Sequence, residues 1–273
     1  MSLRREITGL AALIIFAVCI FWRHGDWLSA VVAAAAFFFA QAEIYGLLSM
    51  PRRRPLLIWQ NVLAALFFVF TVLHNLTAII GILFLFFWGS CLISMRHTVK
   101  GSRYEIAIHG LLLIYLLLPL ASFVYLRSIP NGPYYLFFML AVACFTDIGA
   151  YYGGRLFGRH KLAPVISPNK TWEGAVCGVL LTVAAVCLAA VCQHAWSGGT
   201  LWLPGPDRYL HLILLTILLS AVGQIGDLCE SSMKRDAGIK DSGSTITGHG
   251  GFLDMMDAML FIGPAMFVYS MLG

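Results

Sequence analysis

The sequence predicts an all-α polytopic integral membrane protein with about nine transmembrane helices. Hydrophobic residues make up 60% of the 273-residue chain and charged residues only 11%, which is less than half the share typical of a soluble domain. Apolar runs of about 20 residues recur along the whole chain, and this is the length that a helix needs to cross a bilayer. The runs are continuous and not strictly alternating, which argues against a transmembrane β-barrel.

The predicted spans follow one another with short connections. They lie at 8–22, 27–50, 56–75, 77–95, 105–126, 134–154, 175–196, 209–230 and 257–272. The first follows Arg4 and Arg5 and has no convincing small-residue cleavage site after it, so we interpret it as an uncleaved helix. His74, Asn75 and Thr77 separate the third span from the fourth. If that stretch were one long bent element, the count would fall to eight.

The basic residues predict the orientation of the chain. With a cytoplasmic N-terminus, fifteen of the 18 lysines and arginines lie in inside segments, and only Arg23, Arg127 and Arg208 lie outside. This distribution explains the net charge of +5 without a nucleic acid partner. Together with the short inside loops and the lack of a targeting sequence, it indicates a bacterial inner membrane protein.

The two halves of the chain differ in charge. Residues 1–133 carry few charges inside their spans, Glu43 being the main exception, and we expect them to form a transmembrane scaffold. Residues 134–273 carry acids at several span ends, and we expect them to form a catalytic region with cytoplasmic loops at 155–174 and 231–256.

Five acids lie at the inner side of the predicted membrane: Asp147, Asp227, Glu230, Asp254 and Asp257. An ionised carboxylate near hydrocarbon is costly unless it is paired, wetted or bound to a metal. Asp227, Glu230 and Lys234 share one helical face, so for Glu230 we expect an ion pair. For Asp227 and Asp254, which lie beside glycine-rich backbone, we expect an Mg²⁺ site instead, because Mg²⁺ favours carboxylates together with substrate phosphates.

Basic residues and glycines lie close to these acids. In "SPNKTWEG" (167–174), Lys170 precedes the seventh span, Asn169 and Thr171 can cap that helix, and Glu173 lies in its first turn. "GHGG" (248–251) offers backbone N–H groups that no side chain shields, as phosphate binding requires. The chain has no GxxxxGK[ST] motif, so a P-loop is excluded.

Three stretches of the second half resemble, in the expected order, the motifs of the phosphatidate cytidylyltransferase (CDP-diacylglycerol synthase) family. They are "TDIGAYYGGRLFGRHKLAPVISPNKTWEG" (146–174), "GQIGDLCESSMKR" (223–235) and "SSMKRDAGIKDSGSTITGHGGFLDMMD" (231–257). The first half resembles the family only in being hydrophobic. Thr247 stands where the family usually has Pro or Gly, and Met255 where it has Arg, which removes one expected charge contact.

The resemblance implies that the chain transfers the cytidylyl group of CTP to phosphatidate, giving CDP-diacylglycerol and pyrophosphate at an Mg²⁺-dependent cytoplasmic site. The catalytic residues that it implies are Asp227, Asp254, Asp257, Lys234 and Lys240, and the three aspartates are also the implied metal ligands. The implied substrate-binding residues are Lys170, Arg235, Asp241, His249, Gly250, Gly251 and Asp147. A second cation and a homodimeric assembly stay open.

Two other functions compete with this one. An ion-coupled transporter also places acids in broken helices, but it would predict acids near the bilayer midplane and symmetry between the halves. A CTP-dependent lipid kinase, such as a polyprenol kinase, would share a similar polar end, and the Met255 departure keeps this alternative open.

Overall fold

The computed structural model describes residues 25–50, 53–96, 102–197, 208–243 and 251–272, together with residues 18, 21 and 22. Within these residues, eight helical segments are long and apolar enough to cross a membrane. They coincide with the second to ninth predicted spans, and the all-α polytopic fold is confirmed. The first predicted span, 8–22, lies almost entirely outside the described residues.

The chain divides into two compact units. The first contains 1–133 and 239–256, and the second contains 134–238 and 257–273. The segment 239–256, which the sequence suggested would belong with the second half, is therefore grouped with the N-terminal helices.

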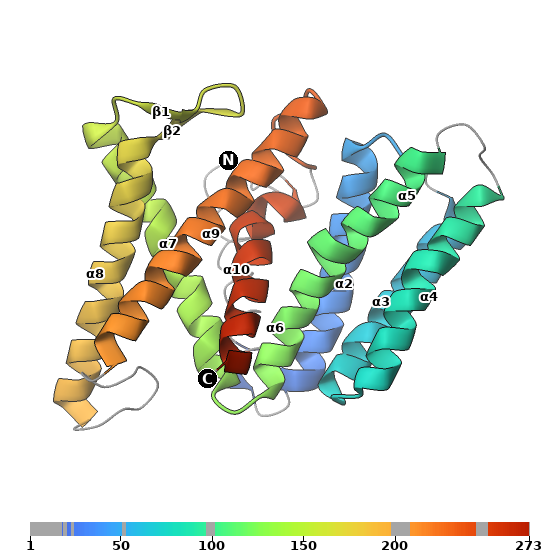
Figure 1. Ribbon diagram of the computed structural model, residues 1–273, viewed down its shortest axis with the longest axis horizontal. Coiled ribbons are helices and arrows are strands. Elements are labelled where there is room, and N and C mark those ends of the chain that lie inside the picture. The colour runs from blue at the N-terminus through green and yellow to red at the C-terminus, as the bar shows by residue number, and fades with distance from the viewer. Residues whose placement is uncertain are drawn as a thin grey trace. The chain divides into compact units, whose positions relative to one another are not determined.

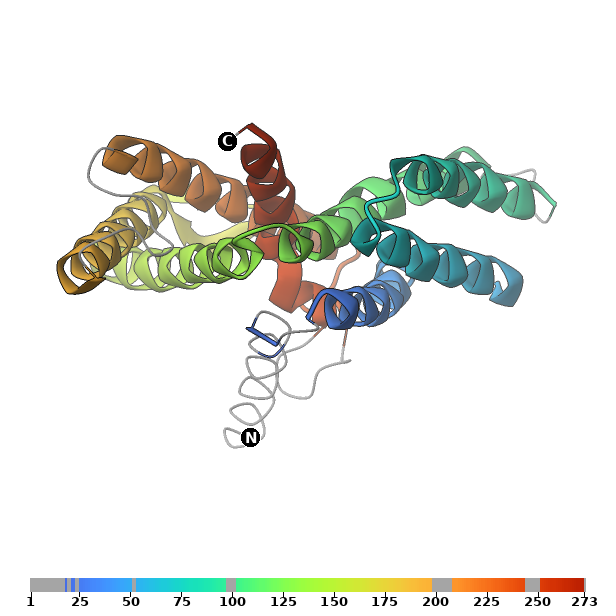
Figure 2. The same ribbon diagram turned by 90° about the horizontal axis from the view of Figure 1, so that it is seen from below.

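The first unit is a helical bundle (Figure 1). It is built from α2 (Gly25–Leu47), α3 (Arg54–Val72), α4 (Leu76–Met95), and a continuous span of α5 (Ser102–Leu111), the π-helical η1 (Leu112–Leu117) and α6 (Leu118–Ser128). α2 lies along α3 and α3 lies along α4 (Figures 1 and 2). The chain reverses between α3 and α4 at His74, whose φ is 50°, and Asn75 then caps α4 by accepting a hydrogen bond from the Ala78 N–H (3.0 Å). The predicted break between these two spans is confirmed.

A buried hydrogen-bond network ties the helices of the first unit together. Gln60 is fully buried, and its side chain accepts from Gln41 Nε2 (2.7 Å) and Tyr45 Oη (2.7 Å). The same amide donates to Ser90 Oγ (3.1 Å), and its nitrogen lies 3.2 Å from His109 Nδ1. Four contacts use the whole hydrogen-bonding capacity of a glutamine side chain. Such contacts hold helices together where hydrocarbon offers no other partner.

Two ion pairs connect residues of the same bundle near its ends. Arg53 forms a bidentate pair with Glu105, with N–O distances of 2.9 and 3.0 Å. Arg127 Nη1 lies 2.7 Å from Asp26 Oδ1, and its other terminal nitrogen donates to the Trp22 carbonyl (2.7 Å). Both pairs join helices that are distant in the sequence, so they fix the packing of the bundle.

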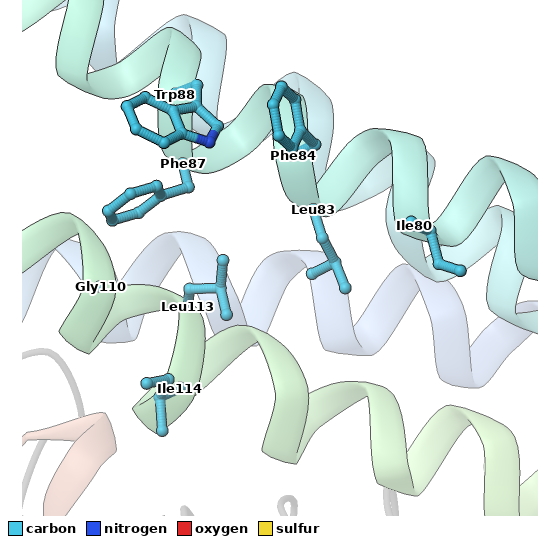
Figure 3. Close-up of a pocket in the computed structure, with 8 residues that line it drawn as sticks. All are labelled: Ile80, Leu83, Phe84, Phe87, Trp88, Gly110, Leu113 and Ile114. Atoms are coloured by element: carbon cyan, nitrogen blue, oxygen red, sulfur yellow. The ribbon is translucent and has the colours of Figure 1, made fainter.

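An apolar groove of about 440 Å³ lies between α4 and the α5–η1 segment (Figure 3). Its lining contains no charged side chain and consists of Ile80, Leu83, Phe84, Phe87, Trp88, Gly110, Leu113 and Ile114. A groove of this composition suits hydrocarbon, as expected for a surface that faces lipid tails.

The second unit contains the remaining elements. They are α7 (Gly132–Phe157) from Tyr134 onward, β1 (Lys161–Ala163), β2 (Ser167–Thr171), α8 (Trp172–Ser197), α9 (Tyr209–Asp236) and α10 (Phe252–Leu272) from Asp257 onward. β1 and β2 form an antiparallel hairpin at the ends of α7 and α8 (Figure 1). Inside this second unit, Thr146 Oγ1 lies 3.0 Å from Thr182 Oγ1 and 2.8 Å from Ser220 Oγ, and these contacts join α7, α8 and α9.

Glycines allow α7 and α8 to approach closely. A Cβ on Gly149 would lie 2.9 Å from the Cys177 carbonyl oxygen, and one on Gly178 would lie 2.8 Å from the Thr146 carbonyl oxygen. These separations leave no room for a side chain. The backbones are therefore in contact just beside Asp147.

The helices extend further than the sequence suggested. α7 continues to Phe157 and α8 begins at Trp172, so the predicted loop 155–174 is mainly the β hairpin. α9 continues to Asp236 and α10 begins at Phe252, which shortens the predicted loop 231–256 to the residues between them. As a result, most of the predicted site residues lie on regular elements.

Candidate active site

Asp227 and Asp257 are neighbours in the second unit because α9 and α10 touch at a glycine. A Cβ on Gly226 would lie 2.6 Å from the Asp257 carbonyl oxygen, and one on Gly223 would lie 2.8 Å from Ile262 Cδ1. The spacing of these two glycines places them on one face of α9. Asp227 follows Gly226 directly, so its carboxylate belongs to the same region as Asp257, with which it interacts electrostatically.

Lys170 joins these acids from the β hairpin. Its ammonium group forms an ion pair with Asp227 Oδ2, and the two side chains are 28% and 31% exposed. Ser231 Oγ, one turn further along α9, donates to Asp227 Oδ1 (3.4 Å). Asp147 on α7 is exposed and interacts electrostatically with both Asp227 and Lys170. Residues from three helices and the hairpin therefore converge on one accessible place.

The convergence leaves an excess of negative charge. Asp147, Asp227 and Asp257 are balanced by Lys170 alone, since neither Asp147 nor Asp257 forms an ion pair with a lysine or arginine of the described residues. Neighbouring like charges repel each other, and a bound cation relieves this repulsion. Carboxylate oxygens are the ligands of hard cations such as Mg²⁺. In the part of the chain that the structure describes, no group of three or more His, Cys, Asp and Glu side chains is arranged to hold a metal ion.

Glu230 and Lys234 form a second ion pair on α9, and Glu230 also interacts electrostatically with Asp257. Glu230 is fully buried and pairs with Lys234, whose side chain is 12% exposed. The ion pair expected for Glu230 is thus confirmed. Lys234, for which the resemblance implies a catalytic role, is held by this contact. Arg235, the next residue, donates from Nε to the Ile166 carbonyl in the hairpin turn (3.1 Å).

The hairpin that carries Lys170 is fixed to the start of α8. Thr171 Oγ1 accepts a hydrogen bond from the Gly174 N–H (3.1 Å), which confirms the predicted cap. The Glu173 carboxylate accepts from the backbone N–H groups of Arg159 (3.1 Å) and His160 (3.2 Å) and lies 2.5 Å from His160 Nδ1. These contacts restrain the hairpin on both sides of its base.

Asp254 lies in the first unit, in the first turn of α10. Its Oδ2 atom accepts hydrogen bonds from the Ser242 N–H (2.9 Å), from Ser242 Oγ (3.0 Å) and from the Gly251 N–H (2.7 Å). A carboxylate in this position caps its own helix, as in a capping box. The metal role that the resemblance implies for Asp254 stays a prediction.

The other predicted site residues are distributed as follows. Lys240 and Asp241 are exposed in the first unit, and Gly251 is buried with its N–H bonded to Asp254. His249 and Gly250 lie outside the described residues.

Glu43 is a residue of this region to which sequence reasoning gave no role. It is only 6% exposed and accepts hydrogen bonds from Ser242 Oγ (3.0 Å) and from the backbone of Phe252 (2.7 Å) and Leu253 (2.9 Å). The signal that could have identified it was present, because an acid within an apolar span is costly without partners. Its partners lie about 200 residues further along the chain, beyond the reach of any local pattern.

The sequence as a whole matches one family of known proteins. The model of the cytidylyltransferase family matches residues 3–272. A Staphylococcus saprophyticus protein named phosphatidate cytidylyltransferase is 45% identical over 146 residues, which is 52% of each chain. A Bacillus subtilis protein of the same name is 40% identical over 170 residues, 62% of this chain and 59% of the relative. The aligned region thus covers less than two thirds of the length of either relative.

Proposed function

Because the chain belongs to the cytidylyltransferase family, we propose that it transfers the cytidylyl group of CTP to phosphatidate, giving CDP-diacylglycerol and pyrophosphate. The names of the relatives support this substrate pair. The observation that carries the proposal is the group of Asp147, Asp227 and Asp257, in which Lys170 pairs with Asp227 and interacts with Asp147. Such a site suits a triphosphate that arrives with a divalent cation.

In the proposed reaction, a phosphate oxygen of phosphatidate attacks the α-phosphorus of CTP. The new P–O bond forms as the bond from the α-phosphorus to the bridging oxygen breaks, and pyrophosphate leaves with the electron pair. A phosphate monoester is already largely ionised near neutral pH, so the attack needs no general base. The protein must hold two anions together in line and neutralise the charge that develops on the leaving group.

The residues of the second unit divide these tasks. Lys170 lies on the hairpin with a partly exposed side chain, and it would neutralise phosphate oxygens. Asp227 and Asp257 would hold Mg²⁺, which typically uses one or two protein carboxylates and completes its shell with substrate phosphates and water. When bound, the cation would neutralise the triphosphate. Asp147 would position Lys170 or a second cation.

The membrane location follows from the same elements. The end of α7, the hairpin that follows it and the end of α9 carry a group of basic residues: Arg155, Arg159, Lys161, Lys170, Lys234 and Arg235. A concentration of basic residues on one side is typical of the cytoplasmic face. We therefore place the site at the cytoplasmic surface of a bacterial inner membrane, where CTP is available.

The position of a radioactive label in the product tests the proposal. Purified protein in detergent is given Mg²⁺, phosphatidate and CTP labelled either at the α- or at the γ-phosphate. We expect α-label, and no γ-label, in the lipid fraction, only when phosphatidate and the metal are both present. Asp227→Asn should abolish the transfer, and Asp236→Asn, which changes an exposed acid on the same helix, should retain it.

The same experiment separates the alternatives. A lipid kinase would place the γ-label in the lipid, and a transporter would place neither label there. Either result, or full transfer by Asp227→Asn, would overturn the proposed function.

A further inference from the structure

The Glu43 side chain, on α2 of the predicted scaffold, contacts the N-terminus of α10. Its Oε1 atom accepts from the Phe252 N–H (2.7 Å) and its Oε2 atom accepts from the Leu253 N–H (2.9 Å). These are the first two N–H groups of the helix, which have no partner within it. Gly251, which directly precedes the helix, has no side chain to cap them. Glu43 therefore caps these two N–H groups from α2, while Asp254 accepts from the N–H of Gly251.

This carboxylate explains Gly243 and contributes to the need for Gly251. A Cβ on Gly243 would lie 2.9 Å from Glu43 Oε1, and a Cβ on Gly251 would clash first with Ser242 Oγ and would also lie 2.7 Å from Glu43 Oε2. Neither separation leaves room for a methyl group beside a buried carboxylate. Gly243 and Gly251 thus stand where a side chain would collide with Glu43 or with its hydrogen-bond partner Ser242.

Glu43 and Asp254 together join Ser242 to the start of α10. Ser242 Oγ lies 3.0 Å from a carboxylate oxygen of each acid, and the backbone N–H groups of Ser242 and Gly251 both donate to Asp254. The chain before residue 244 and the chain after residue 250 are therefore joined at one point. The first turn of α10, which carries Asp254, is fixed there.

We propose that Glu43 is a positioning residue for cytidylyl transfer, which acts by capping α10 and thereby fixing Asp254 and the flanking residues Ser242 and Gly251. The inference rests on the proposed function, and it assigns a role in the reaction to the half of the chain that otherwise forms the bundle. It also explains why a costly acid is kept within α2: its carboxylate is stabilised by the positive end of the α10 dipole.

Hydrogen exchange provides a test that does not depend on activity. In Glu43→Ala, amide exchange at Phe252 and Leu253 should accelerate by about tenfold or more, because these N–H groups lose their acceptor. Glu43→Gln keeps the side-chain volume should the alanine variant not fold, and it should show a smaller acceleration. Glu105→Gln removes a buried acid of the same unit that is bonded to Arg53, and it should leave exchange at these two amides unchanged.

Kinetics and a double-mutant cycle distinguish positioning from general stabilisation. Glu43→Ala should lower kcat/KM by roughly ten- to hundredfold, as is usual for residues that orient a metal ligand, which is the role predicted for Asp254, and Glu43→Asp should recover part of the loss. Gly243→Ala should lower the activity and the stability of the wild-type protein, but it should lower them little further in the Glu43→Ala variant. The added methyl group clashes with the Glu43 carboxylate, so the clash exists only when that carboxylate is present.

The possible failures are distinct. Unchanged exchange at Phe252 and Leu253 in Glu43→Ala, or an equal cost of Gly243→Ala in both backgrounds, would overturn the role of Glu43. If wild-type protein transfers no cytidylyl group, the proposed function fails. Hydrogen exchange at Phe252 and Leu253, and the stability of the Glu43→Ala/Gly243→Ala double variant, still decide whether Glu43 holds the start of α10.

Discussion

The two units bury polar groups in opposite ways. In the first unit, Gln60 and His109 are fully buried, and Gln60 uses all its donors and acceptors on neighbouring side chains. In the second unit, Lys170 and Asp227 remain about 30% exposed, and Asp147 and Asp257 add negative charge that no described cation pairs with. Gln60 is therefore buried and fully hydrogen-bonded, whereas the acidic group of the second unit is accessible and keeps an excess of negative charge.

This difference separates polar residues that stabilise a membrane bundle from those that bind a ligand. A completed network contributes to folding and leaves nothing for a ligand to gain. An accessible excess of negative charge costs stability, and this charge is neutralised only when a cation binds. The comparison therefore predicts opposite responses: neutralising an acid of the second-unit group should impair activity and spare stability, and neutralising Glu105, which is paired with Arg53 in the first unit, should do the reverse.

Asp257→Asn should give the largest effect. We expect roughly a thousandfold loss of cytidylyl transfer, because a group that holds the cation contributes several kcal/mol to the reaction. The thermal midpoint in detergent should stay the same or rise, since one of several like charges is removed. Steady-state kinetics and thermal unfolding of the same preparation measure both quantities. A midpoint that falls in step with activity would mean that Asp257 is a structural residue.

Glu105→Gln should give the largest effect in the opposite direction. Arg53 and Glu105 are only 19% and 7% exposed, so removing one partner leaves a poorly solvated charge and should cost about 2–3 kcal/mol of unfolding free energy. Transfer per folded molecule should change less than about twofold, because the pair lies outside the proposed site. The double variant Arg53→Met/Glu105→Leu should recover part of the stability. Loss of activity without loss of stability would break the comparison.

Lys170→Met should give an intermediate effect. Losing one contact to the phosphates should raise the KM for CTP by about tenfold, with a smaller change in kcat. Lys170→Arg keeps the charge and should retain most of the activity. Because exposed charges are screened, the wild-type KM should rise with ionic strength more steeply than that of the methionine variant. Parallel salt dependences would show that Lys170 does not face the nucleotide.

Much of this contrast could be predicted from the sequence. The spans follow from the length of the apolar runs, and the ion pair of Glu230 with Lys234 follows from their helical spacing. The cap at Thr171 follows from the local pattern before α8. All of these features depend on residues that are close together in the chain.

What could not be predicted depends on pairs that are far apart in the chain. Neither the hydrogen bond of Gln60 with Ser90 nor that of Glu43 with Leu253 leaves a local pattern, because the partners meet only after the helices have packed. The hairpin was also missed, since β1 is three residues long and carries no alternation.

Glu173→Gln should give the smallest effect and tests how far the rigidity of the second unit matters. Its carboxylate holds the base of the hairpin through Arg159 and His160, both of which are exposed to solvent. Exposed contacts of this kind contribute little to stability, so we expect only a two- to threefold rise, roughly, in the KM for CTP. The hairpin should also be cleaved faster by trypsin at Arg159 and Lys161. If the hairpin is cleaved faster while the KM for CTP stays unchanged, Lys170 is positioned by its ion pair with Asp227 and not by the hairpin. In that case, the arrangement of the charged residues in the second unit depends on the interactions between their charges and not on the rigidity of the hairpin.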